Sequence, residues 1–222
     1  MRLPRRLAAA LAGTALAAGA VLATAPSASA LSSTEAGSFL AQLKKTYNDP
    51  TVSSDSNPYD FDIVTKAAYA TGAVDTLANL TSFTLFAPND RAFEVLANKL
   101  GLLGPHHRYG ATVDEKRVIT ALIGALGLDK IRQVLLYHVL PGAKVTGKQV
   151  LSGPFFSRLT MANGQKLGVA VLNRSAAFPV IVLVDKDGSL FNDYVVKSKI
   201  DVVQTPNVVV HGISDVLLPT LS

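Results

Sequence analysis

The stretch FTLFAPNDRAF, residues 83–93, is the most informative part of this chain for its fold. Its first five residues are mostly apolar, which predicts a short buried strand over residues 83–87. Pro88 ends that strand, because proline lacks the backbone N–H that a sheet ladder requires. Asn89 or Asp90 can then cap a helix over residues 91–100 by accepting hydrogen bonds from its first N–H groups. The stretch therefore predicts a buried strand that passes directly into a helix.

Two further segments join an apolar run to a polar break. Residues 135–142 read LLYHVLPG, and residues 207–219 read NVVVHGISDVLLP. Each segment places one histidine, His138 or His211, inside an apolar run. A histidine in that setting is most often a buried core residue with hydrogen-bond partners. The alternative is a ligand or metal site that both histidines share.

Helical patterns dominate the first half of the chain and strand patterns the second. We expect helices at residues 32–47, 60–71, 75–80, 114–126 and 129–136. After Pro141, β-branched and aromatic residues predict strands at 156–160, 166–172, 180–184, 194–202 and 208–213. Asn163-Gly164 has the composition of a hairpin turn. Helices followed by strands, without regular alternation, indicate an α+β domain.

The first thirty residues have the features of a secretory signal peptide. Three arginines precede an apolar run over residues 7–25, and Ala28-Ser29-Ala30 supplies small residues for cleavage. The alternative is an uncleaved membrane anchor. Cleavage leaves 222 − 30 = 192 residues, enough for one domain with a sizeable core. We expect an N-terminal helix and polar linker at 31–59 and the folded domain at 60–222.

Charge and cysteine content limit the partners. Without the three arginines of residues 1–30, 18 basic and 16 acidic residues give a net charge of +2. No basic cluster remains, so we expect no nucleic-acid partner. The chain has no cysteine, which excludes a disulfide and a lipidated cysteine. We therefore expect a secreted, monomeric protein, free or associated with the cell wall, without a stable membrane anchor after cleavage.

No residue pattern in the chain carries a catalytic mechanism. The Gly-x-Ser-x-Gly motif and cysteine nucleophiles are absent. Asp90 and Glu94 would share a helix face, where capping and a solvated surface are favoured over an acid–base pair. We therefore expect no catalytic residues and no cofactor.

A metal site is not predicted either. His106 and His107 are adjacent in an exposed loop over residues 101–112, with no carboxylate at ligand spacing beside them. Asp185, Asp187 and Gly188 begin like a calcium loop, but the further acidic ligands do not follow, so a turn is favoured. We therefore expect solvated loop residues at 106–107 and no metal.

The three segments resemble the motif segments of the fasciclin domain, a secreted adhesion and binding module, and the resemblance spans residues 60–219. The first segment matches through Thr84, Phe86, Ala87, Pro88, Asn89, Asp90, Ala92 and Phe93. The second matches the family's Tyr-His motif through Tyr137 and His138, followed by Pro141-Gly142. The third matches through Asn207, Val209, Val210, His211, Ile213, Val216, Leu217, Leu218 and Pro219. Three ordered matches at suitable spacing make the resemblance specific.

The resemblance implies a wedge of two β-sheets flanked by several helices, with the helices mainly N-terminal and the strands mainly C-terminal. It implies that the motif residues are structural, namely Thr84, Phe86, Pro88, Asn89, Asp90, Phe93, Asn207 and His211. His138 and His211 would fix the backbone at the edge of the core. Val208 departs from the family pattern, which has glycine there, so the turn before it must form without glycine's freedom at positive φ.

The function that the resemblance implies is binding of an extracellular protein or polysaccharide without catalysis. The partner-binding candidates are Tyr137 and His138, if exposed, and the loop residues His106, His107, Arg108 and Tyr109. The alternative is a small-molecule-binding protein or an enzyme that uses a pocket near His138, His211 and Asp90, with a histidine as general base.

Overall fold

The computed structural model describes residues 39, 57–175, 177–187 and 193–221. The predicted signal peptide, the helix at 32–47 except Phe39, most of the linker at 31–59 and the turn residue Gly188 lie outside the described residues. Phe39 is buried, and its ring meets Phe83 edge to face with 5.5 Å between centroids.

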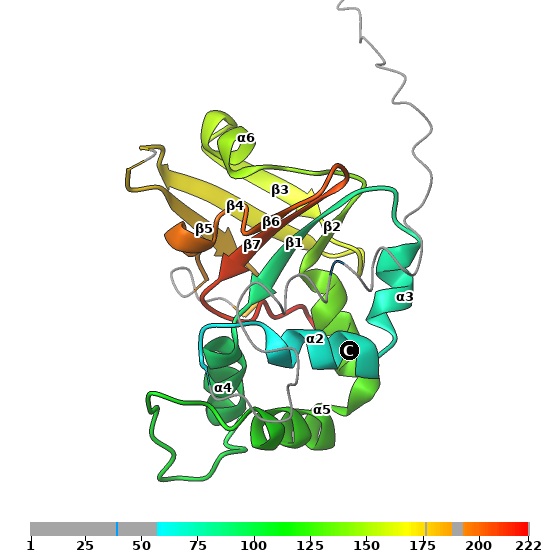
Figure 1. Cartoon of the computed structure of the whole chain (residues 1–222), viewed down its shortest axis with the longest axis vertical. Coiled ribbons are helices and arrows are strands. Elements are labelled where there is room, and N and C mark those ends of the chain that lie inside the picture. Colours follow the sequence, from blue (N-terminus) through cyan, green and yellow to red (C-terminus); the bar gives the residue numbers. More distant parts are fainter. Residues whose placement is uncertain (1–38, 40–56, 176, 188–192, 222) are drawn as a thin grey trace, which may run out of the picture.

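Two β-sheets form the centre of the domain, as the α+β prediction requires (Figure 1). The four-stranded sheet has the order β2-β1-β7-β6, in which β1 runs parallel to β7 and the other pairs are antiparallel. Its strands are β1 (Phe83–Pro88), β2 (Val139–Pro141), β6 (Val203–Gln204) and β7 (Val208–Ile213). The antiparallel three-stranded sheet has the order β3-β4-β5 and comprises Phe156–Thr160, Lys166–Asn173 and Val180–Val184.

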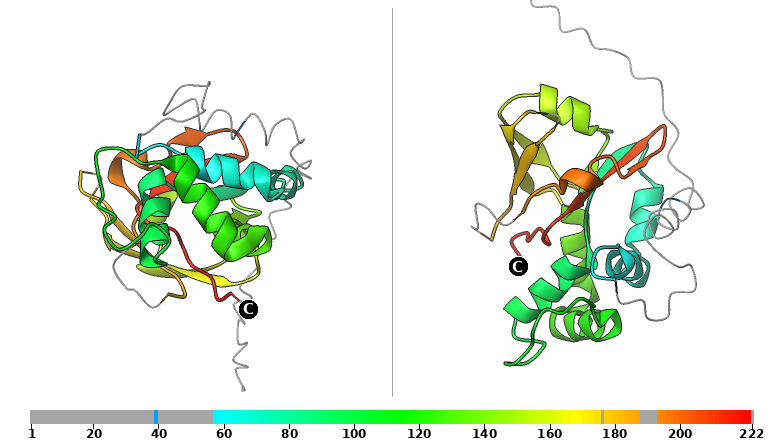
Figure 2. Two further views of the ribbon diagram at one scale, coloured as in Figure 1. Left: turned by 90° about the horizontal axis from the view of Figure 1, so that it is seen from below. Right: turned by 60° about the vertical axis from the view of Figure 1, so that its left-hand side comes forward.

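Four helices pack on one side of the four-stranded sheet, and the three-stranded sheet lies on its other side (Figure 2). The four are α2 (Asp62–Ala70), α3 (Ala73–Ala78), α4 (Asp90–Lys99) and α5 (Glu115–Tyr137). The short helix α6 (Gly147–Ser152) lies at the far end of the sheets from these four helices (Figure 1). The order of layers is therefore helices, sheet, sheet.

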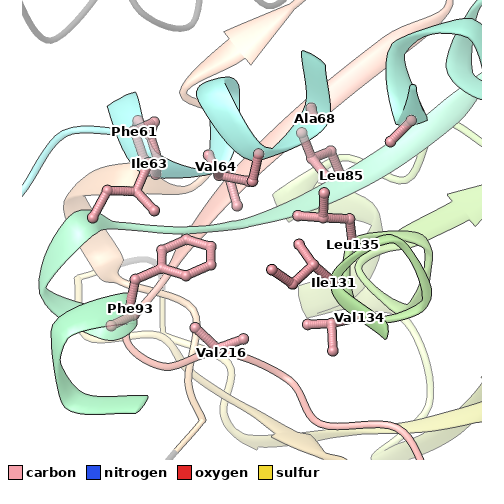
Figure 3. Close-up of a cluster of buried hydrophobic side chains, with 14 of the residues drawn as sticks. Phe61, Ile63, Val64, Ala68, Leu85, Phe93, Ile131, Val134, Leu135 and Val216 are labelled. Atoms are coloured by element: carbon pink, nitrogen blue, oxygen red, sulfur yellow. The ribbon is translucent and has the colours of Figure 1, made fainter. Parts of the chain in front are cut away.

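Strand β1 is buried on both faces because it lies between two cores. Phe83 and Leu85 face the helical core, which Figure 3 shows between α2, α4 and α5. Phe86 points the other way, into the core between the sheets. All six residues of β1 are buried, which explains why its sequence is apolar apart from Thr84 and does not alternate between apolar and polar residues.

Local sequence signals predict most element boundaries correctly. Asn89 caps α4, since its side chain accepts a hydrogen bond from Ala92 N at 2.9 Å. Gly127, with φ 77° and ψ 160°, interrupts α5 where the sequence predicts two separate helices. Gly164, with φ 82°, closes the predicted hairpin between β3 and β4. Val208 is an ordinary strand residue without positive φ, so the missing glycine leaves no strain there.

The predicted strand at residues 194–202 is wrong. Tyr194 and Val195 form isolated bridges to β5 and β7, and the chain then turns through a 3₁₀ helix at Lys197–Lys199. Asp201 follows with φ 54°, a conformation that an extended strand cannot accommodate. The prediction missed strand β2, because three residues are too few to establish a hydrophobic period. It also missed helix α6, whose sequence signal is the capping box of Thr146 and Gln149.

Replacing Gly212 with alanine is expected to destabilise the domain. Gly212 lies in β7, and a Cβ there would lie 2.6 Å from Lys199 Cβ and 3.1 Å from the Phe61 ring. Because Lys199 Cβ is bound to the backbone, it cannot move aside as a side-chain tip would. We expect a loss of about 1–3 kcal/mol in the free energy of unfolding, the usual cost of overpacking.

Urea denaturation measures this loss. Gly124→Ala is the matched control, because a Cβ at Gly124 in α5 meets no atom within 4 Å. Equal stabilities of the two variants would contradict the close approach.

Candidate functional site

Tyr137 and His138 are buried at the end of α5, with 0% and 1% of their surface exposed. Their expected role in partner binding requires exposure, so burial rules it out. The Tyr137 hydroxyl donates a hydrogen bond to Lys166 O at 2.8 Å and so ties α5 to β4. Burial raises the pKa of this phenol. The Tyr-His motif therefore holds the interior together.

His138 uses both ring nitrogens to bind backbone groups. Nδ1 lies 2.8 Å from Val134 O, and Nε2 accepts a hydrogen bond from Leu217 N at 2.9 Å. Since Nε2 accepts, Nδ1 carries the proton, and the ring is neutral. Burial lowers the pKa of His138 to about 4, which the bond to Val134 O only partly opposes. The ring therefore caps the C-terminal end of α5 and fixes the segment after β7.

His211 joins β7 to the segments around α6. Its Nε2 donates to Val145 O at 2.9 Å, and its Nδ1 accepts from Asp201 N at 3.1 Å. Asp201 in turn accepts a hydrogen bond from Gly147 N at 2.8 Å. Burial lowers the pKa of His211, with smaller opposing effects from Val145 O and the Asp201 carboxylate. Both imidazoles are thus occupied by backbone groups.

The other motif residues cluster around the same strands. Thr84 in β1 donates to Ala143 O at 2.8 Å and accepts from Val145 N at 2.9 Å. Asn207 O accepts from Phe83 N at 3.1 Å, just before β7.

The apolar motif residues lie in the two cores. Phe86 faces the core between the sheets, Pro88 ends β1, and Phe93 packs into the helical core. These motif residues are buried in the domain, except Asn207, which is half-buried.

A buried group of carboxylates lies where α2, α4 and α5 begin. Asp90 Oδ1 accepts a hydrogen bond from Ile63 N at 2.9 Å, and Asp90 N donates to Asp60 O at 3.1 Å. Glu115, in the first turn of α5, completes the group. Acids at helix N-termini are stabilised by the helix dipoles. The expected solvated face for Asp90 and Glu94 is wrong, because these side chains are 0% and 2% exposed.

This group is the one among the described residues that has the geometry of a cation site. One oxygen each of Asp60, Asp90 and Glu115 lies within 4.8 Å of the others. Burial raises the pKa of Asp90 well above its usual range, and a hydrogen bond with Asp60 raises it further. Lys66 Nζ lies 2.6 Å from Glu115 Oε2. The raised pKa of Asp90 and the Lys66 ammonium both lower the net negative charge that is buried here. The sequence did not predict the group because Asp60, Asp90 and Glu115 lie far apart in the chain.

The loop between α4 and α5 is held against α4 by side-chain contacts. His107 Nε2 lies 2.9 Å from Glu94 Oε1, and Asn98 Nδ2 donates to the Tyr109 hydroxyl at 3.0 Å. Arg91 pairs with Glu94, donates to the backbone carbonyl of Gly110 and places its guanidinium 5.6 Å from the Tyr109 ring centroid. The prediction of a freely solvated His107 is therefore wrong.

The same loop exposes a basic and aromatic surface. His106, Arg108 and Tyr109 are exposed, and the loop extends away from the helical layer (Figure 1). Lys116 and Arg117 at the start of α5 are also exposed. We call residues 104–110 the α4–α5 loop. Three of its four predicted contact residues reach solvent.

A cavity of about 140 Å³ lies between the two sheets, beneath α6. Apolar side chains from both sheets form most of its wall: Phe86, Leu140, Val169, Val171, Ile181 and Val195. His211 lines the cavity but His138 and Asp90 do not, so this cavity is not the pocket near both histidines that the alternative function requires. No sequence signal pointed to this cavity, because its wall combines residues from both sheets and α6.

A second exposed surface is the outer face of the three-stranded sheet. Phe156, Leu172 and Val180 lie on its strands and are 40–50% exposed. Tyr194, which pairs with Val182 of β5, is 48% exposed beside them. Apolar side chains gathered on one face are typical of interaction surfaces. We call this surface the outer sheet face.

Comparison with known proteins gives one family. A profile described as the fasciclin domain matches residues 59–219. Fifteen chains among the solved structures match, among them a FAS1 domain pair from the insect cell adhesion molecule fasciclin I. That match has a TM-score of 0.47 and 20% identity, and it covers 71% of this chain and 43% of that one. The chain thus spans less than half the length of that structure.

Two further findings are negative. No curated protein sequence matches the chain. In the part of the chain that the structure describes, none of the helices combines the length and the apolar composition needed to span a bilayer.

Proposed function

Because this chain belongs to the fasciclin domain family, we propose that it is an extracellular interaction module. It binds an anionic polysaccharide or an acidic protein surface through the α4–α5 loop, without catalysis. The observation that carries the proposal is the bracing of this loop by Arg91, Glu94 and Asn98, which leaves its other side open to a partner.

The bracing lowers the cost of binding. A partner that contacts an already ordered loop does not need to compensate for the entropy lost when the loop orders. Tyr109, 49% exposed, keeps one face against Arg91 and offers the rest to a partner. Tyrosine and arginine are the residues that most often dominate binding energy at interfaces.

The charge near the loop favours an anionic partner. Arg108, Lys116 and Arg117 are exposed there against one exposed acid, Asp114, whereas Glu94 is buried and paired, so the exposed charge is net positive. Arg108 can bind a carboxylate or phosphate through two hydrogen bonds. An anionic polymer of the cell surface or an acidic protein patch meets both requirements, and an exported protein would encounter either of them.

The absence of catalysis rests on the two histidines of the core. A general base needs a nitrogen free to take a proton from a substrate. In His138 and His211, both nitrogens already bind backbone groups. This occupancy supports a binding role over the enzymatic alternative.

Tyr109→Ala is expected to weaken binding at least about tenfold, the loss typical of an aromatic anchor at an interface. Binding of the protein to cell-wall polysaccharide and to exported proteins of its host is measured by biolayer interferometry. Arg108→Ala should weaken binding and flatten its dependence on salt, because it removes one screened charge pair. Tyr69→Ala, an exposed tyrosine on α2, is the control and should bind as the wild type does.

A second variant separates the loop from the outer sheet face. Phe156→Ser removes an exposed aromatic side chain from that face. If it abolishes binding while Tyr109→Ala does not, the outer sheet face is the contact surface and the α4–α5 loop is not. Wild-type affinity in both loop variants would also overturn the proposal.

A further inference from the structure

The cavity between the sheets has the composition of an apolar binding site. The six apolar side chains named above come from β1, β2, β4, β5 and Val195, and Val145, Val150, Pro154 and Leu159 add to them, so both sheets contribute. The two most deeply placed polar side chains are already bonded, since Thr84 and His211 each contact two backbone groups. The site therefore offers contact surface without a charged group or an unbonded polar group at its base.

The volume sets the size of the ligand. An apolar cavity of about 150 Å³ is known to admit benzene, and this cavity is of nearly the same size, about 140 Å³. A single six-membered ring, or a short hydrocarbon chain of similar volume, would fill it. A polar molecule of that size would lose its hydrogen bonds to water without replacing them.

The entrance of the cavity is more polar than its base. Gln149, Gly153 and Pro154 on and after α6 line one side, and Ser157 of β3 lies near them. Gln149 is exposed and Ser157 is half-buried, and because Gln149 Oε1 already accepts hydrogen bonds from Thr146 N and Oγ1, Gln149 Nε2 and the Ser157 hydroxyl are the groups left for a ligand. They can bind a single polar group on a ligand whose hydrocarbon part lies inside. This arrangement orients a ligand with its apolar end first.

We propose that the cavity between the sheets binds a small neutral hydrocarbon group, either a free molecule or the apolar end of a larger one, entering beside α6. This binding site is separate from the α4–α5 loop, which connects α4 to α5, whereas the entrance of the cavity lies beside α6. The two proposals can therefore fail independently.

Toluene and benzoate test the proposal, since they share one ring and differ in charge. In a titration of protein with ¹³C-labelled methyl groups, toluene should give saturable shifts with a dissociation constant of about 0.1–1 mM, as expected for so few atoms. Intermolecular nuclear Overhauser effects should reach the methyls of Leu140, Val169, Val171 and Ile181. Benzoate should bind at least about tenfold more weakly, because no lysine or arginine lines the cavity.

Val150→Phe tests the location. Val150 is half-buried on α6 and lines the cavity, so a phenyl group there should fill the space and weaken toluene binding at least about tenfold. Val180→Phe is the control, because Val180 lies on the outer sheet face beside the cavity residue Ile181. It should bind toluene as the wild type does.

Three results would overturn the inference. They are the absence of saturable toluene binding to the wild type, Overhauser contacts only with the helical core or the outer sheet face, and benzoate binding as tight as that of toluene. If Val150→Phe does not fold, the contacts measured on the wild type decide the question alone.

Discussion

Replacing His138 with alanine is expected to lower the free energy of unfolding by about 3–5 kcal/mol, a larger loss than that expected for Gly212→Ala. The change leaves Leu217 N–H and Val134 O without their side-chain partner in a site that is 1% exposed. It also opens a cavity where the ring was. The unpaired groups and the cavity both lower the free energy of unfolding.

The pH dependence of the stability difference between this variant and the wild type separates the lost hydrogen bonds from the cavity. Burial lowers the pKa of His138 from 6.5 to about 4, because desolvation disfavours the protonated ring. Protonation would also remove the acceptor that Leu217 N–H needs. The neutral ring therefore stabilises the fold fully above pH 6.5, and this stabilisation is lost as the pH falls through about 4. The stability difference between wild type and His138→Ala should shrink over that interval.

Urea denaturation at several pH values measures both effects. His106→Ala is the matched control, because it removes an exposed histidine from the α4–α5 loop. We expect that variant to match the wild type in stability. A His138→Ala protein as stable as the wild type at neutral pH would show that the ring does not brace the core.

Replacing Asp193 with asparagine is expected to stabilise the protein progressively as the pH rises. Asp193 is 2% exposed, and its Oδ2 makes no hydrogen bond. Burial raises the pKa of this carboxyl to about 8, and repulsion from Asp185, Asp215 and Asp187 adds to the shift while Lys99 opposes it. Ionising Asp193 near neutral pH therefore costs folding free energy.

The direction of this pH effect on stability follows from proton linkage. A carboxyl group with a raised pKa in the folded state stabilises the fold below its ordinary pKa near 4, and this stabilisation is lost as the pH rises through about 8. Asparagine cannot ionise, so the variant avoids the loss. Between these pH values the free energy of unfolding of the variant should rise by on the order of 2–4 kcal/mol relative to that of the wild type. This gain is below the full value of about 1.4 kcal/mol per pKa unit, because the neighbouring carboxyls also change their protonation.

Thermal and urea unfolding from pH 4 to pH 8 test this trend. Asp129→Asn makes the same change in net charge at an exposed site on α5 and should leave the stability difference nearly constant. A constant difference for Asp193→Asn as well would mean that its carboxylate is hydrated at neutral pH.

Local chemistry explains which elements could be predicted. Pro88, Asn89, Gly127 and Gly164 act on the backbone within a few residues, so their turns, caps and breaks could be read directly. Residues 194–202 misled the prediction because their apolar pattern resembles a strand. The turn at Asp201 depends on His211 and Gly147, which lie far along the chain. Its cause is therefore absent from the local pattern.

The sequence by itself determined the α+β class, most element boundaries and membership of the fasciclin family. Only the tertiary structure decided which polar side chains are buried, that His107 is held against Glu94, and that a cavity opens beside His211. The physical reason is the range of the interactions. Caps and turns form between neighbours in the chain, whereas burial and cavities depend on how elements from distant parts of it pack together.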